Sequence, residues 1–396
     1  MSRDTRTALI VGGGIAGPIA GMALNRAGIQ ATVYEAYEGK AEGVGGGLSI
    51  APNGLAALAA IGADDIVRSV GTPMKSIVLQ SGTGRTLGEF GTPPDLPATQ
   101  FVTRAELYTS LYDEAARRGV HVVHGKRVIG VDDSGDDVTA HFADGTSACA
   151  DVLIGADGIR STVRSLIDPA APMPRYAGLV SFGALVKDTG LASTGGRMYM
   201  SFGKRAFLGY QIFDDASGVW FVNLPHPDPM TQAEARARGA ETWLRELVEA
   251  FRGDRTVAVD LIGRTGPPDL VITGPVESMP RVPTWSRGRM VLIGDAAHAA
   301  SSSSGQGASL ATESAVQLAR CLRDLPHDKA FERYEELRRP RVERIIAATA
   351  RTNSNKAAGP IGRVLRDLVL PVAMKRVKPE KSAWQFDYRI DWNAPA

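Results

Sequence analysis

A glycine-rich turn near the N-terminus constrains the fold of this chain more than any other feature. The turn, Gly12–Gly17, has the sequence GGGIAG and follows an apolar run at 7–11 that predicts a buried strand. The alanine-rich run at 15–27 predicts a helix, and the run at 31–35 predicts the next parallel strand. Strand, turn, helix and strand in this order predict a βαβ unit at the start of an α/β fold.

The same turn provides the first candidates for contact with a cofactor. Glycines here permit a tight turn, close approach of a pyrophosphate, and close packing of helix on strand. The N-terminus of the following helix favours phosphate oxygens, and Glu35, at the end of the next strand, can accept hydrogen bonds from ribose hydroxyls. We therefore expect a dinucleotide, either FAD or NAD, to contact this turn and Glu35. The candidates within the turn are Gly12, Gly14, Ile15, Ala16 and Gly17.

Two further turns follow apolar runs and precede predicted helices. The second is Gly155-Ala156-Asp157-Gly158, and the third is Gly294-Asp295, which follows the apolar run at 290–293. The segment Gly305-Gln306-Gly307-Ala308 then leads into a predicted helix near 310–325. Each turn alone could be an ordinary strand-to-helix connection, but their order favours a single nucleotide site.

With these motifs in this order over nearly the whole chain, the sequence resembles the single-component (group A) FAD-dependent monooxygenases. This para-hydroxybenzoate hydroxylase-like family includes tetracycline-degrading oxygenases of similar size. The resemblance implies that the first turn and Glu35 hold the ADP half of FAD, and that Gly294 and Asp295 reach the ribityl chain. It places Asp157 and Gly158 near the pyrophosphate and gives Arg104 a contact with FAD.

The helix that starts near Gly305 has a separate expected role. Its dipole and free N–H groups could stabilise negative charge on a reduced flavin, with Gly305, Gln306, Gly307 and Ala308 beside the ring. One departure from the family pattern lies just before it. The run at 301–304 consists of serines, and Ser302 stands where the family often has proline.

A β-rich pattern interrupts the nucleotide-binding pattern twice. We expect a Rossmann-like FAD-binding domain with C-terminal helices, formed by 1–73, 101–176 and 281–396, and a β-sheet substrate domain, formed by 74–100 and 177–280.

Several local elements are also predicted. The run at 75–90 predicts a hairpin, 103–118 a helix capped by Thr103, and 231–251 a single helix. We expect Pro340 to kink or break a C-terminal helix. The apolar run at 365–372 predicts a core or docking segment.

Aromatic and methionine side chains of the β-rich part are the candidates for lining a substrate cavity. Because side chains alternate along strands, about half of them could be plain core. Tyr210 and Gln211 could also orient a phenol or a carbonyl group. The substrate candidates are Phe182, Met200, Tyr210, Phe213, Trp220 and Ser302.

Composition argues against several other functions. Lys and Arg total 45 and Asp and Glu total 43, a balance that provides no electrostatic basis for binding nucleic acid or an anionic membrane. The two cysteines, Cys149 and Cys321, form no metal or redox pair, so we expect no metal site and a reducing, cytoplasmic environment. We expect the protein to be a monomer or a homodimer.

The resemblance implies chemistry that is centred on the flavin, and no catalytic triad is visible in the sequence. NADH or NADPH would reduce FAD, and O2 would form a C4a-hydroperoxyflavin that hydroxylates or epoxidises an aromatic or polyketide-like small molecule. The alternatives are a non-oxygenating FAD-dependent reductase or dehydrogenase, and a flavoprotein that only binds a ligand.

Overall fold

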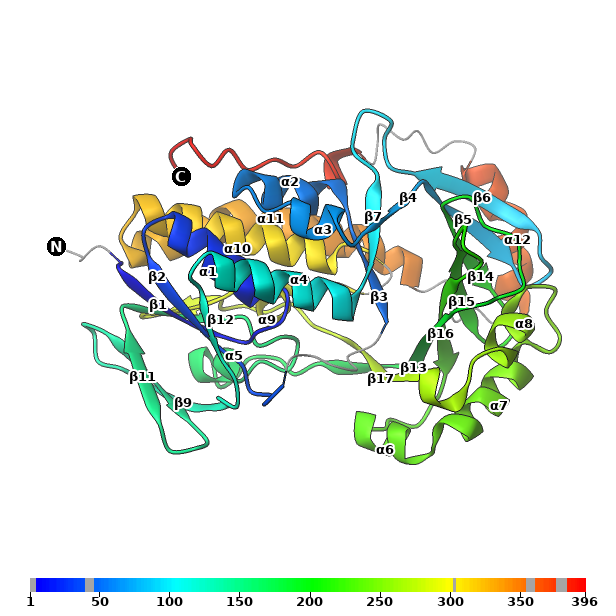
Figure 1. Cartoon of the computed structure of the whole chain (residues 1–396), viewed down its shortest axis with the longest axis horizontal. Helices are drawn as coiled ribbons and strands as arrows, with labels where there is room; N and C mark the ends of the chain where they lie inside the picture. Colours follow the sequence, from blue (N-terminus) through cyan, green and yellow to red (C-terminus); the bar gives the residue numbers. More distant parts are fainter. Residues whose placement is uncertain (1–4, 40–45, 302–303, 354–359, 375–382) are drawn as a thin grey trace.

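The structure, a computed structural model, describes residues 5–39, 46–301, 304–353, 360–374 and 383–396. Its elements form a six-stranded sheet covered by helices, beside a seven-stranded sheet with helices of its own (Figure 1). Among the described residues, no helix is both long enough and apolar enough to span a bilayer.

The six-stranded sheet has the strand order β18-β19-β12-β1-β2-β8. Strands β19, β12, β1, β2 and β8 are mutually parallel, and β18 is antiparallel at the edge. This arrangement confirms the predicted βαβ unit and α/β class. The strands are β1 (Thr7–Val11), β2 (Gln30–Tyr34), β8 (His121–Val123), β12 (Val152–Gly155), β18 (Ser286–Arg287) and β19 (Met290–Leu292).

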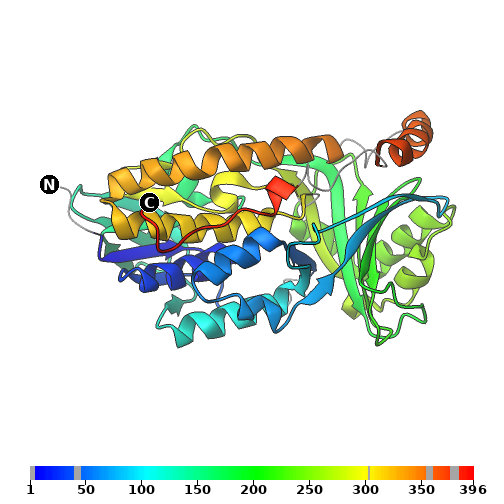
Figure 2. The ribbon, with the colours of Figure 1, turned by 90° about the horizontal axis from the view of Figure 1, so that it is seen from above.

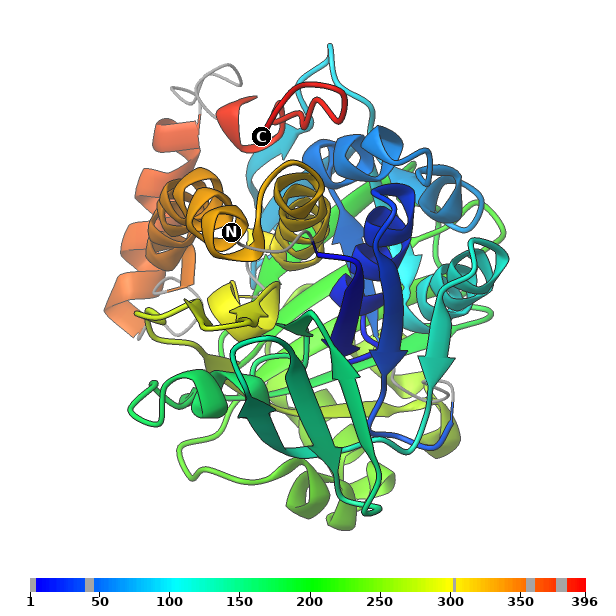
Figure 3. The same cartoon turned by 90° about the vertical axis from the view of Figure 1, so that its left-hand side faces the viewer.

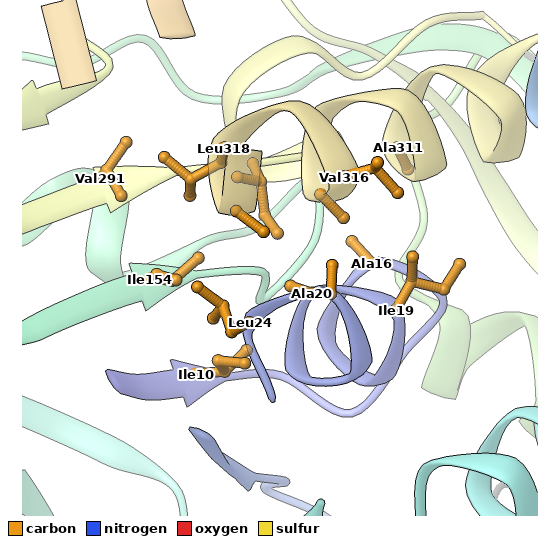
Figure 4. Packing of buried hydrophobic residues seen from close by; sticks show 14 of the residues in the cluster. Ile10, Ala16, Ile19, Ala20, Leu24, Ile154, Val291, Ala311, Val316 and Leu318 are labelled. Carbon is orange, nitrogen blue, oxygen red and sulfur yellow. The ribbon is translucent and has the colours of Figure 1, made fainter. Parts of the chain in front are cut away.

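Both faces of this parallel sheet are covered, which explains why its central strands are continuous apolar runs. Helices α1 (Ala16–Arg26) and α10 (Gly307–Asp324) cover one face; Figure 4 shows Leu24 and Ala20 of α1 facing Leu318 of α10 above Ile154. The antiparallel sheet of β9 (Val128–Asp133), β10 (Val138–Phe142) and β11 (Ser147–Ala150) lies on the other side (Figure 3).

Shorter elements complete this half of the molecule. Thr103 caps α4 by accepting a hydrogen bond from the Glu106 backbone N–H, which confirms the predicted cap. The other helices here are α2 (Pro52–Ala60), α3 (Asp65–Arg68), α4 (Arg104–Arg117), α5 (Thr162–Ile167) and α9 (Asp295–His298).

The seven-stranded sheet has the order β17-β13-β16-β15-β14-β5-β6. The predicted hairpin at 75–90 is confirmed as the antiparallel pair β5–β6 at one edge. Helices α7 (Ala240–Phe251) and α8 (Ala258–Gly263) cover the outer face of this sheet (Figure 1). The strands are β5 (Ser76–Ser81), β6 (Thr86–Gly91), β13 (Arg175–Val186), β14 (Arg197–Phe202), β15 (Phe207–Ile212), β16 (Gly218–Pro225) and β17 (Val271–Ser278).

The single helix predicted over 231–251 is wrong, because two helices occupy this region. Helix α6 (Gln232–Ala237) ends before Gly239, which has a φ of 83° and turns the chain into α7 (Ala240–Phe251). The connection back to β17 then contains α8 (Ala258–Gly263) and a 3₁₀ turn, η1 (Pro267–Asp269).

A small antiparallel sheet, β3-β7-β4, joins the two large sheets (Figure 1). Its strands are β3 (Gly47–Ile50), β4 (Thr72–Met74) and β7 (Thr99–Thr103). The chain passes from β4 into β5 and returns from β6 through β7 into α4, so this sheet lies where the chain crosses between the two halves.

The C-terminal part is helical, as predicted, but Pro340 does not break it. Helix α11 (His327–Asn353) runs through Pro340. Arg338 and Arg341 both bind Glu313 of α10, which holds the helix in place despite the backbone hydrogen bond that proline removes.

Helix α12 (Pro360–Met374) contains the apolar run at 365–372 and lies against β6 at the far end of the molecule (Figure 2). Leu365 and Leu368 are each about 60% exposed, so this run is not a core segment; of the two predicted roles, core or docking, the docking role is confirmed, because α12 lies against β6. Residues 383–396, with the 3₁₀ turn η4 (Ala383–Gln385), return to α10.

Candidate functional site

The first and second turns meet because their strands, β1 and β12, are parallel neighbours. The Ala156 N–H donates a hydrogen bond to the carbonyl oxygen of Val11 over 2.8 Å. Gly12 has a φ of 107°, and a Cβ at this position would lie 2.5 Å from the Ala156 carbonyl oxygen. Gly12 is therefore required by the contact between the two turns.

The third turn joins the other two through β19. The Ile293 N–H donates to the carbonyl oxygen of Gly155 over 2.9 Å. Gly294 has a φ of 58°, and a Cβ there would lie 3.2 Å from the Cβ of Ala16, at the start of α1. The three turns are distant in sequence and converge at one edge of the parallel sheet.

Two glycines of the first turn have different surroundings. A Cβ on Gly17 would lie 2.0 Å from the Gly12 carbonyl oxygen, so Gly17 permits the packing of α1 on the turn. A Cβ on Gly14 would meet no atom within 4 Å. Gly14 therefore faces open space, as the close approach of a pyrophosphate requires.

Glu35 is tied to the first turn through its carboxylate. Oε2 accepts a hydrogen bond from the Gly13 N–H over 2.6 Å, and Oε1 accepts one from the Tyr37 N–H over 3.0 Å. The Tyr112 hydroxyl donates to the Gly13 carbonyl oxygen over 2.7 Å. Burial and the negative charge of Glu35 raise the pKa of Tyr112, which keeps it a neutral donor. No pattern in the sequence marked Tyr112.

Asp157 binds the start of α5. Its carboxylate accepts hydrogen bonds from the N–H groups of Thr162 (2.7 Å) and Val163 (3.0 Å) and from the Ser161 hydroxyl. Asp157 therefore fixes the shape of the second turn, in which Gly158 has a φ of 77°.

Arg164, which sequence reasoning missed, connects the second turn to the third. It is 1% exposed. Its Nη1 donates to the Ala296 carbonyl oxygen over 3.1 Å, and its Nη2 donates to the Ile159 carbonyl oxygen over 2.7 Å.

Asp295, in the third turn, and Arg104, at the start of α4, lie close enough for their charges to interact. The Asp295 side chain is exposed to solvent, yet protein packs densely around its carboxylate. This environment raises the pKa of Asp295, and the positive charge of Arg104 opposes the shift. Burial raises the pKa of Tyr108, to which Arg104 is hydrogen-bonded, and the charges of Asp295 and Glu35 raise it further.

The N-terminus of α10 completes this side of the site. Gly305 has a φ of 60°, α10 begins at Gly307, and Ala308 follows in its first turn. A Cβ on Gly307 would meet nothing within 4 Å, so the start of the helix is open to a ligand. Ser302 lies outside the described residues.

Gln306 points inward and belongs to a buried polar cluster. Asn53 of α2 donates from Nδ2 to Gln306 Oε1 (3.0 Å) and to Glu313 Oε1 (2.6 Å). Glu313 also binds Arg338 and Arg341 of α11, whose charges, together with the Asn53 amide, lower its pKa against the effect of burial. This cluster, which the sequence did not reveal, connects α2, α10 and α11 and fixes the start of α10.

His298 is a structural residue of the third turn. Its Nε2 lies 2.8 Å from the Ser314 hydroxyl, and its ring packs beside Trp285. Burial and the nearby charge of Arg338 lower the pKa of His298 to about 3, so the imidazole is neutral.

The two faces of the seven-stranded sheet have different surroundings. Phe182, Tyr210 and Trp220 face α7 and α8 and belong to the core between the sheet and these helices. The Phe182 ring centroid lies 4.8 Å from that of Trp243, and Trp220 Nε1 donates to Thr265 Oγ1 over 3.0 Å. The prediction that Phe182, Tyr210 and Trp220 line a substrate cavity is therefore wrong, because alternation along their strands turns them to the helical side.

The opposite face carries Met200 and Phe213, which pack against a cluster of Met74, Phe101, Met198 and Val219. Phe101, from β7, contacts Phe213 with 6.2 Å between ring centroids, and its ring occupies the space beside Gly47 of β3. We call this surface the inner face, because it lies toward β3 and the start of α10. Ser49 of β3 is next to Gly305, just before α10: a Cβ on Gly305 would lie 3.5 Å from Ser49 Oγ. Of the predicted substrate residues, Met200 and Phe213 are on this face.

Known proteins are similar to this chain in sequence and in structure. A family model described as "FAD binding domain" matches residues 5–198 and 277–349. The chain is 33% identical over 353 residues to an FAD-dependent urate hydroxylase of Klebsiella pneumoniae subsp. pneumoniae, covering 86% of this chain and 87% of that protein. It is 33% identical over 379 residues to a 3-amino-4-hydroxybenzoate 2-monooxygenase of Streptomyces platensis, covering 92% of each. A solved structure of Klebsiella pneumoniae HpxO with FAD and uric acid has a TM-score of 0.81 at 26% identity, covering 96% of this chain and 95% of that chain.

Proposed function

The chain belongs to the FAD binding domain family, as an FAD-dependent monooxygenase, and from this premise we propose its reaction. It uses NADH or NADPH and O2 to hydroxylate or epoxidise an aromatic or polyketide-like small molecule. FAD supplies hydride acceptance and oxygen activation when bound. The protein supplies binding, orientation and exclusion of water.

This proposal rests above all on the convergence of the three turns, the third of which carries Asp295. In the proposed arrangement, the first turn and Glu35 bind the ADP half of FAD, and Asp157 and Gly158 shape the wall near the pyrophosphate. Asp295 accepts a hydrogen bond from the ribityl chain, with Arg104 beside it. The open start of α10 at Gly307 stabilises negative charge on the flavin ring.

The substrate is proposed to bind between the start of α10 and the inner face. Urate and 3-amino-4-hydroxybenzoate, named for two relatives, are flat aromatic molecules, and the side chains of Met200 and Phe213 suit such a ring. The division into an FAD-binding domain (1–73, 101–176, 281–396) and a substrate domain (74–100, 177–280) belongs to this proposal. So do a cytoplasmic location and a monomeric or homodimeric state.

Turnover measurements test the reaction. Purified protein is expected to be yellow and to oxidise NADH or NADPH faster when a suitable phenol or heteroaromatic compound is added. Uptake of O2 and a product heavier by one oxygen atom would support the monooxygenase reaction. Turnover without O2 uptake would favour the alternative, a non-oxygenating FAD-dependent reductase or dehydrogenase.

Replacement of Asp295 tests the cofactor site separately. Asp295→Ala removes the proposed ribityl acceptor and should weaken FAD retention by about tenfold or more, since such a hydrogen bond contributes roughly 1–3 kcal/mol. Asp295→Asn, which keeps an acceptor of the same shape, should retain more FAD. Wild-type FAD content in Asp295→Ala would remove Asp295 from the site.

A further inference from the structure

The side chain of Gln211 has an unusual environment. Gln211 lies in β15 and is 1% exposed, and its Oε1 has no hydrogen-bond partner among the described residues. Leaving an amide oxygen buried without a partner costs about 1–3 kcal/mol. A group outside the chain that donates a hydrogen bond would remove this cost.

The strand register places Gln211 on the inner face. Gln211 lies opposite Val219 of β16, and residues directly opposite each other in an antiparallel pair project to the same side. Val219 belongs to the cluster of Met74, Phe101 and Met198. Gln211 therefore presents its amide among apolar side chains, whereas its neighbour Tyr210 points to the helical side.

A short series of contacts connects this position with the cofactor-binding turns. Val219, Phe213 and Phe101 belong to one cluster, and the Phe101 ring lies against Gly47 of β3. Ser49, also in β3, lies next to Gly305, just before α10. The unpartnered oxygen is therefore on the same face of the sheet as the cluster that reaches the start of α10 through β3.

We propose that Gln211 Oε1 accepts a hydrogen bond from an N–H or O–H group of the substrate. This inference rests on the proposed function and makes Gln211 a specificity-determining residue of the same site. The substrate class is then a flat aromatic molecule that carries a neutral donor, such as an arenol or a ring N–H. A methyl ether of the same molecule leaves Oε1 unpaired, and sites built on a buried polar group discriminate strongly against such analogues.

Gln80 of the same sheet shows what a structural glutamine looks like here. Its Nε2 donates to the Gly84 carbonyl oxygen over 3.2 Å, and its Oε1 accepts from the Ser201 hydroxyl over 2.8 Å. The Oε1 of Gln80 is thus satisfied within the protein, whereas that of Gln211 is not. Gln80→Leu is therefore a matched control for Gln211→Leu.

The test compares the affinities of the FAD-loaded protein for matched ligands. Binding is measured through the change in flavin absorbance that each ligand causes. The probes are two matched pairs: salicylate with 2-methoxybenzoate, and 3-amino-4-hydroxybenzoate with 3-amino-4-methoxybenzoate. Wild-type protein and Gln80→Leu should bind at least one arenol about tenfold more tightly than its ether, and Gln211→Leu should lose this preference. Without ligand, Gln211→Leu should keep or raise the unfolding temperature, whereas Gln80→Leu should lower it.

Two results would overturn the inference. One is a wild-type protein with no preference for the arenols, whether the probes bind equally or do not bind. The other is a Gln211→Leu variant that keeps the preference. Failure of the proposed function looks different, because the protein would then bind no FAD or consume no O2 with any substrate. A working oxygenase with unchanged selectivity in Gln211→Leu refutes only the role of Gln211.

Discussion

The three converging turns and the seven-stranded sheet are specified in different ways. In the turns, backbone atoms of distant segments touch, so residues such as Gly12 and Gly17 are fixed by the lack of space for a Cβ. In the sheet, function depends on which of two faces a side chain occupies, and both faces are largely apolar. A turn of this kind can therefore be recognised residue by residue, whereas the facing of a strand needs the register.

The largest expected effect tests the steric basis of the turns. Gly17→Ala places a Cβ 2.0 Å from the Gly12 carbonyl oxygen, so α1 must move away from the turn that it packs against. Because α1 belongs to the core on the parallel sheet, we expect little folded protein and no bound FAD. Soluble yield and the absorbance of bound flavin measure this outcome.

Gly14→Ala is the matched control, because its Cβ meets no atom of the protein within 4 Å. This variant should fold with a wild-type circular dichroism spectrum yet lose FAD affinity, since the new methyl group would occupy the proposed path of the pyrophosphate. If Gly17→Ala gives a normal yield of protein with a wild-type circular dichroism spectrum, as Gly14→Ala should, the steric account of the first turn is wrong.

The second prediction compares the two faces of the sheet. Phe182→Ala removes a fully buried ring that packs on Trp243 and should lower the free energy of unfolding by about 3–5 kcal/mol. In the protein that remains folded, the KM for substrate should change little. Urea denaturation and steady-state kinetics give the two values.

Phe213→Ala, on the inner face, should affect substrate binding more than stability. Phe213 is only partly buried, so the loss of stability should be smaller, while the KM should rise because the ring faces the proposed substrate space. A Phe182→Ala variant that raises the KM more than Phe213→Ala would contradict the assignment of the faces.

The same contrast explains how far the sequence could predict the molecule. The βαβ unit, the β5–β6 hairpin and the Thr103 cap follow from local patterns, and the three turns do converge. The sequence wrongly predicted that Phe182 and Trp220 line the substrate space, whereas they belong to the core beside α7 and α8. Alternation along a strand separates two sets of side chains but does not say which set faces the helices. Arg164 and the cluster of Asn53 and Glu313 could not be found, since their partners lie far away in the sequence.

A third prediction uses the buried imidazole of the third turn. His298 has an unfolded pKa near 6.5 and a folded pKa of about 3, so the unfolded chain binds the proton more readily between these values. Its contribution to stability is complete above pH 6.5 and is lost as the pH falls toward 3. Between pH 7.5 and pH 5 this loss amounts to about 2 kcal/mol.

The comparison variant is His298→Gln, whose amide can replace the imidazole Nε2 beside Ser314 and does not titrate. Both proteins are compared at pH 7.5 and pH 5. The free energy of unfolding of the wild type should fall by about 2 kcal/mol more than that of His298→Gln, because only the wild type carries the buried imidazole. Parallel curves for the two proteins would show that the imidazole is not held neutral by burial.

The smallest expected effect concerns α12. One side of this helix packs against the seven-stranded sheet, and the other side is exposed to solvent. Leu370 faces the cluster around Phe202, whereas Leu368 is 61% exposed. Leu368→Ser should therefore change the free energy of unfolding by less than about 0.5 kcal/mol. Leu370→Ser should cost about 1–2 kcal/mol, because it removes apolar area that the helix buries against the sheet.

Urea denaturation at low protein concentration measures both values. The comparison is informative because the inward side of α12 carries charge: the Arg366 guanidinium lies 4.5 Å from the centroid of the Phe202 ring, and Asp367 binds Arg366. Besides these charged residues, Leu370 packs against the cluster around Phe202, and Met374 packs against Gly88 of β6. Equal losses from Leu368→Ser and Leu370→Ser would mean that α12 buries both sides in solution, and the assignment of an open side to this helix would fail.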